Sequence, residues 1–221
     1  EKNPRVWKGI KRFALLIFIG YMLRYPTTTI IDFSSVTESQ WRIFFAVDVL
    51  HLIGFGILFV LLLVYISEKT RTGDYVVFIT AALMFFIPAD SFNQIDWISF
   101  LPHPIASYFY TGTGSQFPLF PWAGYVVLGG ALGSYLAKNP LVFKSPGFSL
   151  VLTIIGVILL FLSYIGNDIA ILFGYSLDRS STSLLTISFR LGFVLLLNAL
   201  VSFISISVET IPRIIILVGR N

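Results

Sequence analysis

Long apolar stretches alternate with short polar ones along the whole chain. Crossing the roughly 30 Å hydrocarbon core of a bilayer takes about 20 helical residues. Six stretches approach that length, and a seventh begins near Pro212. The predicted spans are about 7–25, 43–66, 74–90, 118–137, 148–172 and 184–208. The pattern predicts an all-α integral membrane protein, a polytopic bundle of six transmembrane helices plus the start of a seventh, in one domain over 1–221.

Composition agrees with this class. Hydrophobic residues make up 56% of the 221 and charged residues only 12%, about half the usual share of charge in a soluble domain. With two histidines and no cysteine, the chain has too few ligands for an ordinary zinc site, so we expect no metal. The net charge of +4 does not indicate nucleic acid, because the basic residues follow the membrane topology.

The basic residues gather on one side of the predicted spans. Of the 15 Lys and Arg, 11 lie before the first span, in the second–third and fourth–fifth connections, and in the tail. By the positive-inside rule this predicts a cytoplasmic N-terminus in a multi-pass protein of the cytoplasmic (inner) membrane. The chain lacks an initiator Met and stops just after an apolar run, "IIILVGRN". We interpret both ends as truncations.

One non-cytoplasmic connection, residues 91–117, is long and aromatic and has no Lys or Arg. Its apolar middle is too short to cross a bilayer and is broken by Pro102 and Pro104, which predicts a re-entrant or interfacial segment. Aromatic side chains in and after it are candidates for stacking on sugar faces, although an interfacial aromatic belt explains them equally: Trp97, Tyr108, Tyr110 and Trp122.

The predicted membrane region contains ionisable residues that a lipid-facing helix avoids. Asp48 and His51 share one face of the second span, and Arg190 lies at a similar depth in the sixth. A functional interpretation has Asp48 orienting His51 and raising its basicity, with Arg190 placing a positive charge beside an anionic group. A structural interpretation has Asp48 paired with Arg190 as an internal strut and His51 as a packing residue. His103, between two prolines, is either a pocket residue or an ordinary surface residue.

Two blocks of sequence are distinctive. "VDVLHLIGFGILF" (47–59), followed after the long connection by "FPLFPWAGYVVLGGALG" (117–133), resembles the bacterial membrane proteins related to heparan-alpha-glucosaminide N-acetyltransferase. "KRFALLIFIGYML" fits the basic-flanked helix before these blocks, and "LVGRN" (217–221) resembles the start of the last conserved helix of that family. The resemblance covers most of the chain in order.

The resemblance implies a polytopic enzyme that transfers an acetyl group from acetyl-CoA, its cosubstrate, to an amino sugar or another cell-envelope saccharide. A histidine-containing segment of the family has no counterpart here, so no key histidine is carried over from it. The resulting expectations are His51 and Asp48 as catalytic residues, Lys69 and Arg71 as cofactor-binding residues, and a substrate pocket formed by Arg190, His103, Trp122, Phe117 and Pro118.

Three alternatives stay open at the level of sequence. The positive-inside pattern alone explains Lys69 and Arg71 without any cofactor. A proton- or anion-coupled transporter or flippase would also use polar groups within its spans, although no internal repeat supports one. The chain also fits a catalytically silent membrane subunit of a larger complex. Expected partners are membrane lipids, the saccharide acceptor and, for the last alternative, other membrane subunits.

Overall fold

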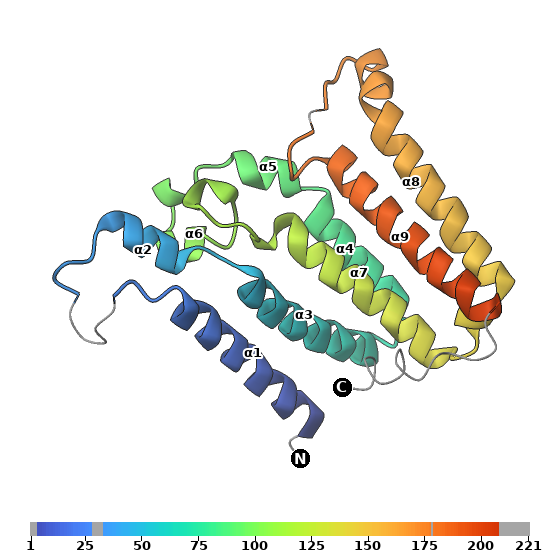
Figure 1. The fold of residues 1–221 in the computed structure, drawn as a ribbon, viewed down its shortest axis with the longest axis horizontal. Helices are drawn as coiled ribbons and strands as arrows, with labels where there is room; N and C mark the ends of the chain where they lie inside the picture. Colours follow the sequence, from blue (N-terminus) through green and yellow to red (C-terminus); the bar gives the residue numbers. More distant parts are fainter. Residues whose placement is uncertain (1–3, 28–32, 178, 208–221) are drawn as a thin grey trace. The chain divides into compact units, whose positions relative to one another are not determined.

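The computed structural model describes residues 4–27, 33–177 and 179–207, which form helices and turns without a strand (Figure 1). The helices are α1 Pro4–Leu23, α2 Glu38–Phe45, α3 Val49–Thr70, α4 Asp74–Phe86, α5 Ala89–Gln94, η1 Trp97–Ser99, α6 His103–Ala106, η2 Thr111–Thr113, α7 Leu119–Lys138, η3 Val142–Lys144, α8 Pro146–Leu172 and α9 Leu184–Ser207. The chain divides into two compact units, Glu1–Ser134 and Tyr135–Asn221. That both belong to one transmembrane domain stays a prediction.

Five helical stretches in the described part of the chain are long and apolar enough to cross a membrane. They are Glu38–Thr70, Asp74–Gln94, Leu119–Lys138, Pro146–Leu172 and Leu184–Ser207. They coincide with the second to sixth predicted spans. The first predicted span, 7–25, forms the 20-residue α1, which is outside this set. Six crossings and a cytoplasmic N-terminus therefore stay predictions, and the seventh span near Pro212 lies outside the described residues.

The second predicted span, 43–66, is not one continuous helix in the structure. Helix α2 ends at Phe45, the backbone at Ala46 is extended, and α3 begins at Val49. The backbone N–H of Val47 donates to Ser115 Oγ (2.9 Å), and its carbonyl accepts from the N–H groups of Gln116 (3.1 Å) and Phe117 (3.3 Å). These bonds replace the helical ones and stabilise the break within an apolar sequence.

In the first unit, α1 packs antiparallel to α3, and the two lie side by side in Figure 1. Close approach depends on glycines: a Cβ on Gly9 would meet Leu61, and a Cβ on Gly54 would meet Ile17. An edge-to-face contact between Phe13 and Phe55 lies midway. Small residues that bring helix backbones together are the usual device of membrane helix pairs.

The predicted long connection 91–117 folds into short helical turns. The Asn93 side chain accepts hydrogen bonds from the N–H and the hydroxyl of Thr111 (3.0 and 2.9 Å). Trp97 Nε1 donates to the carbonyl of Phe92 (2.8 Å), and Tyr108 packs edge-on against Phe55 of α3. The connection is therefore a packed part of the first unit. Its interfacial or re-entrant position stays a prediction.

A polar cluster fastens the C-terminal end of α3. Ser67 Oγ is within hydrogen-bonding distance of the carbonyl of Thr72 (2.7 Å) and of Asp74 Oδ1 (2.5 Å). Ser134 Oγ, from α7, donates to Asp74 Oδ2 (2.9 Å). We call Ser67, Asp74 and Ser134 the carboxylate clasp. It ties α3, α4 and α7 together at one end.

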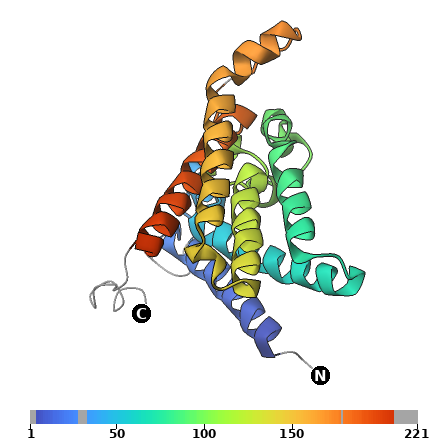
Figure 2. The same cartoon turned by 90° about the vertical axis from the view of Figure 1, so that its right-hand side faces the viewer.

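The second unit is built on α8 and α9, which run side by side in Figures 1 and 2. Their backbones nearly touch: a Cβ on Gly192 would lie 2.8 Å from the carbonyl oxygen of Gly156. Ser149 Oγ donates to the carbonyl of Ala199 (3.0 Å), and Ser202 Oγ donates to that of Phe143 (2.5 Å). Small residues again set the helix spacing.

Candidate functional site

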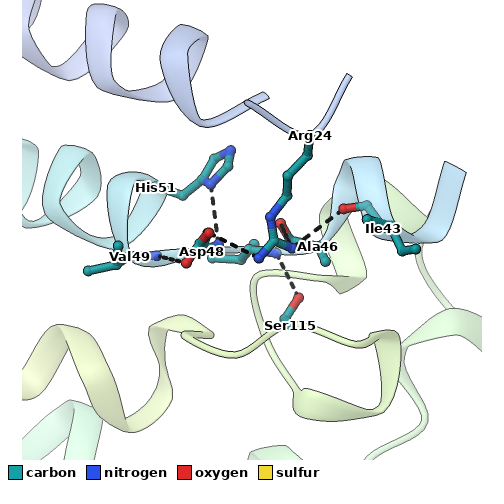
Figure 3. Close-up of polar contacts among 8 residues, drawn as sticks. Arg24, Ile43, Ala46, Asp48, Val49, His51 and Ser115 are labelled. Carbon is teal, nitrogen blue, oxygen red and sulfur yellow. Dashed lines mark hydrogen bonds and ion pairs between the residues drawn. The ribbon is translucent and has the colours of Figure 1, made fainter. Parts of the chain in front are cut away.

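Asp48 and His51 lie at the first turn of α3, joined in a reciprocal cap (Figure 3). The Asp48 carboxylate accepts from the backbone N–H of Val49 (2.6 Å) and from that of His51. The backbone N–H of Asp48 in turn donates to Nδ1 of His51 (3.3 Å). Glu or Gln normally holds this third helical position in a capping box, so His51 replaces an ordinary capping residue.

This cap determines where the His51 proton lies. Because a backbone N–H can only donate, Nδ1 is the acceptor and must be unprotonated, and the neutral ring carries its proton on Nε2. The His51 side chain is 0% exposed, and its Nε2 has no hydrogen-bond partner among the described residues. An unmatched buried donor costs about 1–3 kcal/mol. His51 therefore presents a buried N–H that is ready for an acceptor.

Arg24, at the end of α1, supplies the partner of Asp48. Its Nη2 lies 3.0 Å from Asp48 Oδ2, with the two side chains 20% and 33% exposed. Its Nη1 donates to the carbonyls of Ala46 (3.4 Å) and Ile43 (3.5 Å), at the helix break. The Asp48 carboxylate thus contacts Arg24 and backbone amides, whereas the backbone amide orients the His51 ring.

Aromatic and small residues surround the His51 ring. The Tyr21 ring packs edge-on at 4.5 Å between centroids, and Tyr108 lies at 6.3 Å. Their hydroxyls share a 2.9 Å hydrogen bond. Burial, followed by that hydrogen bond, raises the pKa of Tyr108, so the hydroxyl stays neutral. On the α1 side a Cβ on Gly20 would lie 2.6 Å from His51 Cε1, so only glycine fits there unless the ring moves.

His103, the second histidine, lies near the same aromatic group. Its ring centroid is 6.5 Å from that of Phe45, which also contacts Tyr21. Nδ1 lies 3.4 Å from Ser107 Oγ, and the buried Nε2 has no partner in the described part of the chain. Burial lowers the pKa of His103, and nearby Arg42 lowers it further. The neutral form of His103 is thus favoured, and the two histidines border one set of rings.

Three predicted pocket residues lie in the packed core of the first unit. Phe117 and Trp122 pack against a buried cluster of Leu52, Leu119 and Ala123, and their ring centroids are 4.9 Å apart. Pro118 is fully buried. Tyr108 packs against the same cluster and also contacts His51, so these residues support the site from behind. That they contact substrate stays a prediction.

Three further residues were predicted at the site, Lys69, Arg71 and Arg190. Lys69 and Arg71 are exposed at the C-terminal end of α3, where Arg71 adopts a left-handed conformation (φ 56°) that ends the helix. Arg190 belongs to the second unit, and its Nη1 donates to the carbonyl of Ser181 (3.2 Å). No group of three His, Asp or Glu able to hold a metal occurs in the described ranges, and the expectation of no metal stays a prediction.

Sequence reasoning missed the residues of α1. Gly20, Tyr21 and Arg24 contact the site, but none of them was among the predicted site residues. A usable signal existed, because Tyr21 and Arg24 are three residues apart and so share one face of a helix. A polar face at the end of an apolar helix indicates a buried polar partner.

The fold and the site define a class, a helical multi-pass membrane protein with a buried polar centre at a helix start. A model of the family described as heparan-alpha-glucosaminide N-acetyltransferase, catalytic, matches residues 1–164. The chain belongs to this family and is an acetyltransferase-like membrane protein. The match includes the whole first unit and most of α8. Comparisons with curated proteins and with solved structures gave no match.

Proposed function

We propose that the protein transfers an acetyl group from acetyl-CoA to the amino group of an amino sugar in a cell-envelope saccharide, and that His51 contacts the reacting group. One observation supports this above the others: the buried Nε2–H of His51 has no partner among the described residues. Membership of the N-acetyltransferase family supplies the reaction class.

The proposed role of His51 is that of a hydrogen-bond donor. In acetyl transfer the amine nitrogen attacks the thioester carbonyl carbon, the C–N bond forms and the C–S bond breaks. The proton lost by the nitrogen leaves with the thiolate as the free thiol of CoA. Negative charge builds up on the carbonyl oxygen during the attack, and a fixed donor in a buried site stabilises it. The Nε2–H of His51 suits this task, because the cap at Nδ1 fixes the ring.

The cosubstrate approaches from the other end of α3 in this proposal. Lys69 lies 18 residues after His51 on the same helix, which corresponds to about 27 Å. Phosphates of CoA at Lys69 and Arg71 would therefore place the acetyl group near His51 only if the cofactor extends along α3. The proposal also includes insertion in the inner membrane with a cytoplasmic N-terminus, which puts Lys69 and Arg71 on the cytoplasmic side.

The test uses the full-length protein in proteoliposomes, with labelled acetyl-CoA outside and glucosamine-type acceptors inside, and the reverse arrangement. The decisive variant is His51→Gln, because a Gln at this position keeps the capping acceptor but replaces the imidazole. We expect transfer to fall at least about tenfold, while the melting temperature stays close to that of the wild type. His51→Ala should lower both.

The outcomes separate the two parts of the proposal. Undiminished transfer by a folded His51→Gln protein would leave the acetyltransferase in place and make His51 a capping residue only. Wild-type protein that labels no acceptor in either arrangement would overturn the enzyme proposal in favour of a transporter or a silent subunit.

A further inference from the structure

The second unit contains a cavity, and none of the residues that form the His51 site line it. Its volume is about 200 Å³, and it lies between α8 and the start of α9. Its lining residues are Ser163, Arg179, Leu185, Thr186 and Phe189. All five belong to the second unit, and four of them lie beyond the region matched by the family model.

Two hydrogen bonds hold the α8–α9 connection beside the cavity. Asn167 Oδ1, on α8, accepts from the backbone N–H of Leu177 (2.9 Å). Arg190 Nη1, on α9, donates to the carbonyl of Ser181 (3.2 Å). Arg179 lies two residues from each of these anchored points in the sequence.

The polar part of the lining suits an oxyanion. Arg179 presents a planar guanidinium, which binds phosphate and carboxylate groups through two parallel hydrogen bonds. Thr186 Oγ1 accepts from Ser183 Oγ (3.2 Å), so its own O–H proton can turn toward a ligand. Leu185 and Thr186 also belong to the first turn of the 24-residue α9, where the helix dipole favours negative charge.

The rest of the lining is apolar. Leu185 and Phe189 form one side of the cavity, and Phe189 is followed one turn later by Phe193. Both phenylalanines are about half exposed (54% and 52%). An apolar chain attached to the oxyanion can lie along this strip, whereas a small hydrophilic anion would make no contact with it. The combination is typical of an amphiphile site.

We propose that this cavity binds the oxyanion headgroup of an anionic lipid, with Arg179 as the principal contact and Thr186 as a second donor. The apolar chain of the lipid lies along Phe189 and Phe193. This site is independent of acetyl transfer, and its test does not require catalytic activity.

The test measures lipid binding to delipidated full-length protein in a neutral maltoside detergent by native mass spectrometry. The probes are phosphatidylglycerol, diacylglycerol as the same apolar body without phosphate, and inorganic phosphate as the headgroup chemistry alone. Variants are Arg179→Gln, Arg179→Lys and, as a matched loss of one exposed positive charge in the same unit, Lys144→Gln.

We expect a phosphatidylglycerol adduct that weakens about tenfold or more in Arg179→Gln, the size of one lost charge-assisted hydrogen bond. It should be partly retained in Arg179→Lys and unchanged in Lys144→Gln. Equal losses in Arg179→Gln and Lys144→Gln, or equal binding of diacylglycerol, would overturn the proposal. Binding of inorganic phosphate without binding of the lipid would also overturn it and indicate a site for a soluble anion.

Discussion

Both ends of α3 have a carboxylate among their polar groups, but the two ends differ in whether every polar atom has a hydrogen-bond partner. At the C-terminal end, the carboxylate clasp pairs the Asp74 carboxylate with two serine hydroxyls. At the N-terminal end, Asp48 is also matched, by Arg24 and by backbone amides. His51 differs, because one ring nitrogen is used as a cap and the other has no partner among the described residues.

This difference distinguishes polar groups whose hydrogen bonds are complete within the fold from a polar group that can still bind something else. A matched carboxylate within a helix bundle explains itself, since its hydrogen bonds offset the cost of burial. A buried donor without an acceptor lowers stability, so an acceptor from outside the chain, such as a water or a ligand, would stabilise it. The sequence shows an acid at each end of α3. Only the contacts in the structure reveal at which end all the hydrogen bonds are formed.

The largest effect is expected from filling the space beside His51. In Gly20→Ala the new methyl group would lie 2.6 Å from Cε1 and 2.9 Å from Nδ1 of His51. The ring must move, which breaks the cap and costs about 1–3 kcal/mol. We expect a lower melting temperature together with the loss of any acetyl transfer, measured by thermal unfolding in detergent and by the proteoliposome assay.

Gly129→Ala on α7 is the matched control for this substitution. A Cβ there meets nothing within 4 Å in the described part of the chain, and Ala is favoured over Gly within a helix by up to about 1 kcal/mol. We expect Gly129→Ala to be neutral or stabilising. If both alanine variants behaved alike, the close contact between Gly20 and His51 would not be real.

A smaller effect is expected at the clasp. Ser134→Ala removes one hydrogen bond to the Asp74 carboxylate, which contributes about 1.5–3 kcal/mol when an ionised group is involved. The melting temperature should fall while acetyl transfer per folded molecule stays unchanged, because Ser134 lies at the end of α3 away from His51. If Ser134→Ala lost acetyl transfer without losing stability, the clasp would not be purely structural and the contrast between the two ends of α3 would be wrong.

The smallest effect concerns pH and His103. Because burial holds the pKa of His103 below its ordinary value, the folded protein binds fewer protons there than the unfolded chain does. Its stabilising contribution is complete above about pH 6.5 and is lost as the pH falls through the folded-state pKa. The melting temperature of wild type should therefore drop more on acidification than that of His103→Gln, and identical pH profiles would contradict this.

The membrane-spanning helices were largely predictable, and the break between α2 and α3 was not. The fifth and sixth spans, predicted at 148–172 and 184–208, form α8 and α9 within two residues, because the length of an apolar run is a local property. The break depends on Val47 pairing with residues 115–117, a contact between distant segments. Asp48 nevertheless indicated that a helix could begin directly after it, since Asp is a preferred N-cap residue.

The candidate site was predictable in part. The spacing of Asp48 and His51 indicated that the two residues lie close together, and the structure joins them in one cap at the start of α3. The way Asp48 and His51 face each other was not predictable. It depends on the hydrogen bonds of Asp48 to Arg24 and of both residues to the backbone of the cap. The pairing of Asp48 with Arg24 involves a residue from another helix, and one sequence does not show which of several arginines comes close.

The hydrogen bonds of Val47 also have a consequence for biosynthesis. Ser115, which accepts from the Val47 N–H, is 68 residues further along the chain. While the ribosome is still making this segment, the bend before α3 has backbone groups that cannot remain bare in hydrocarbon. The nascent chain must therefore keep Val47 hydrated, or straighten the bend into a continuous helix, until Ser115, Gln116 and Phe117 have been made.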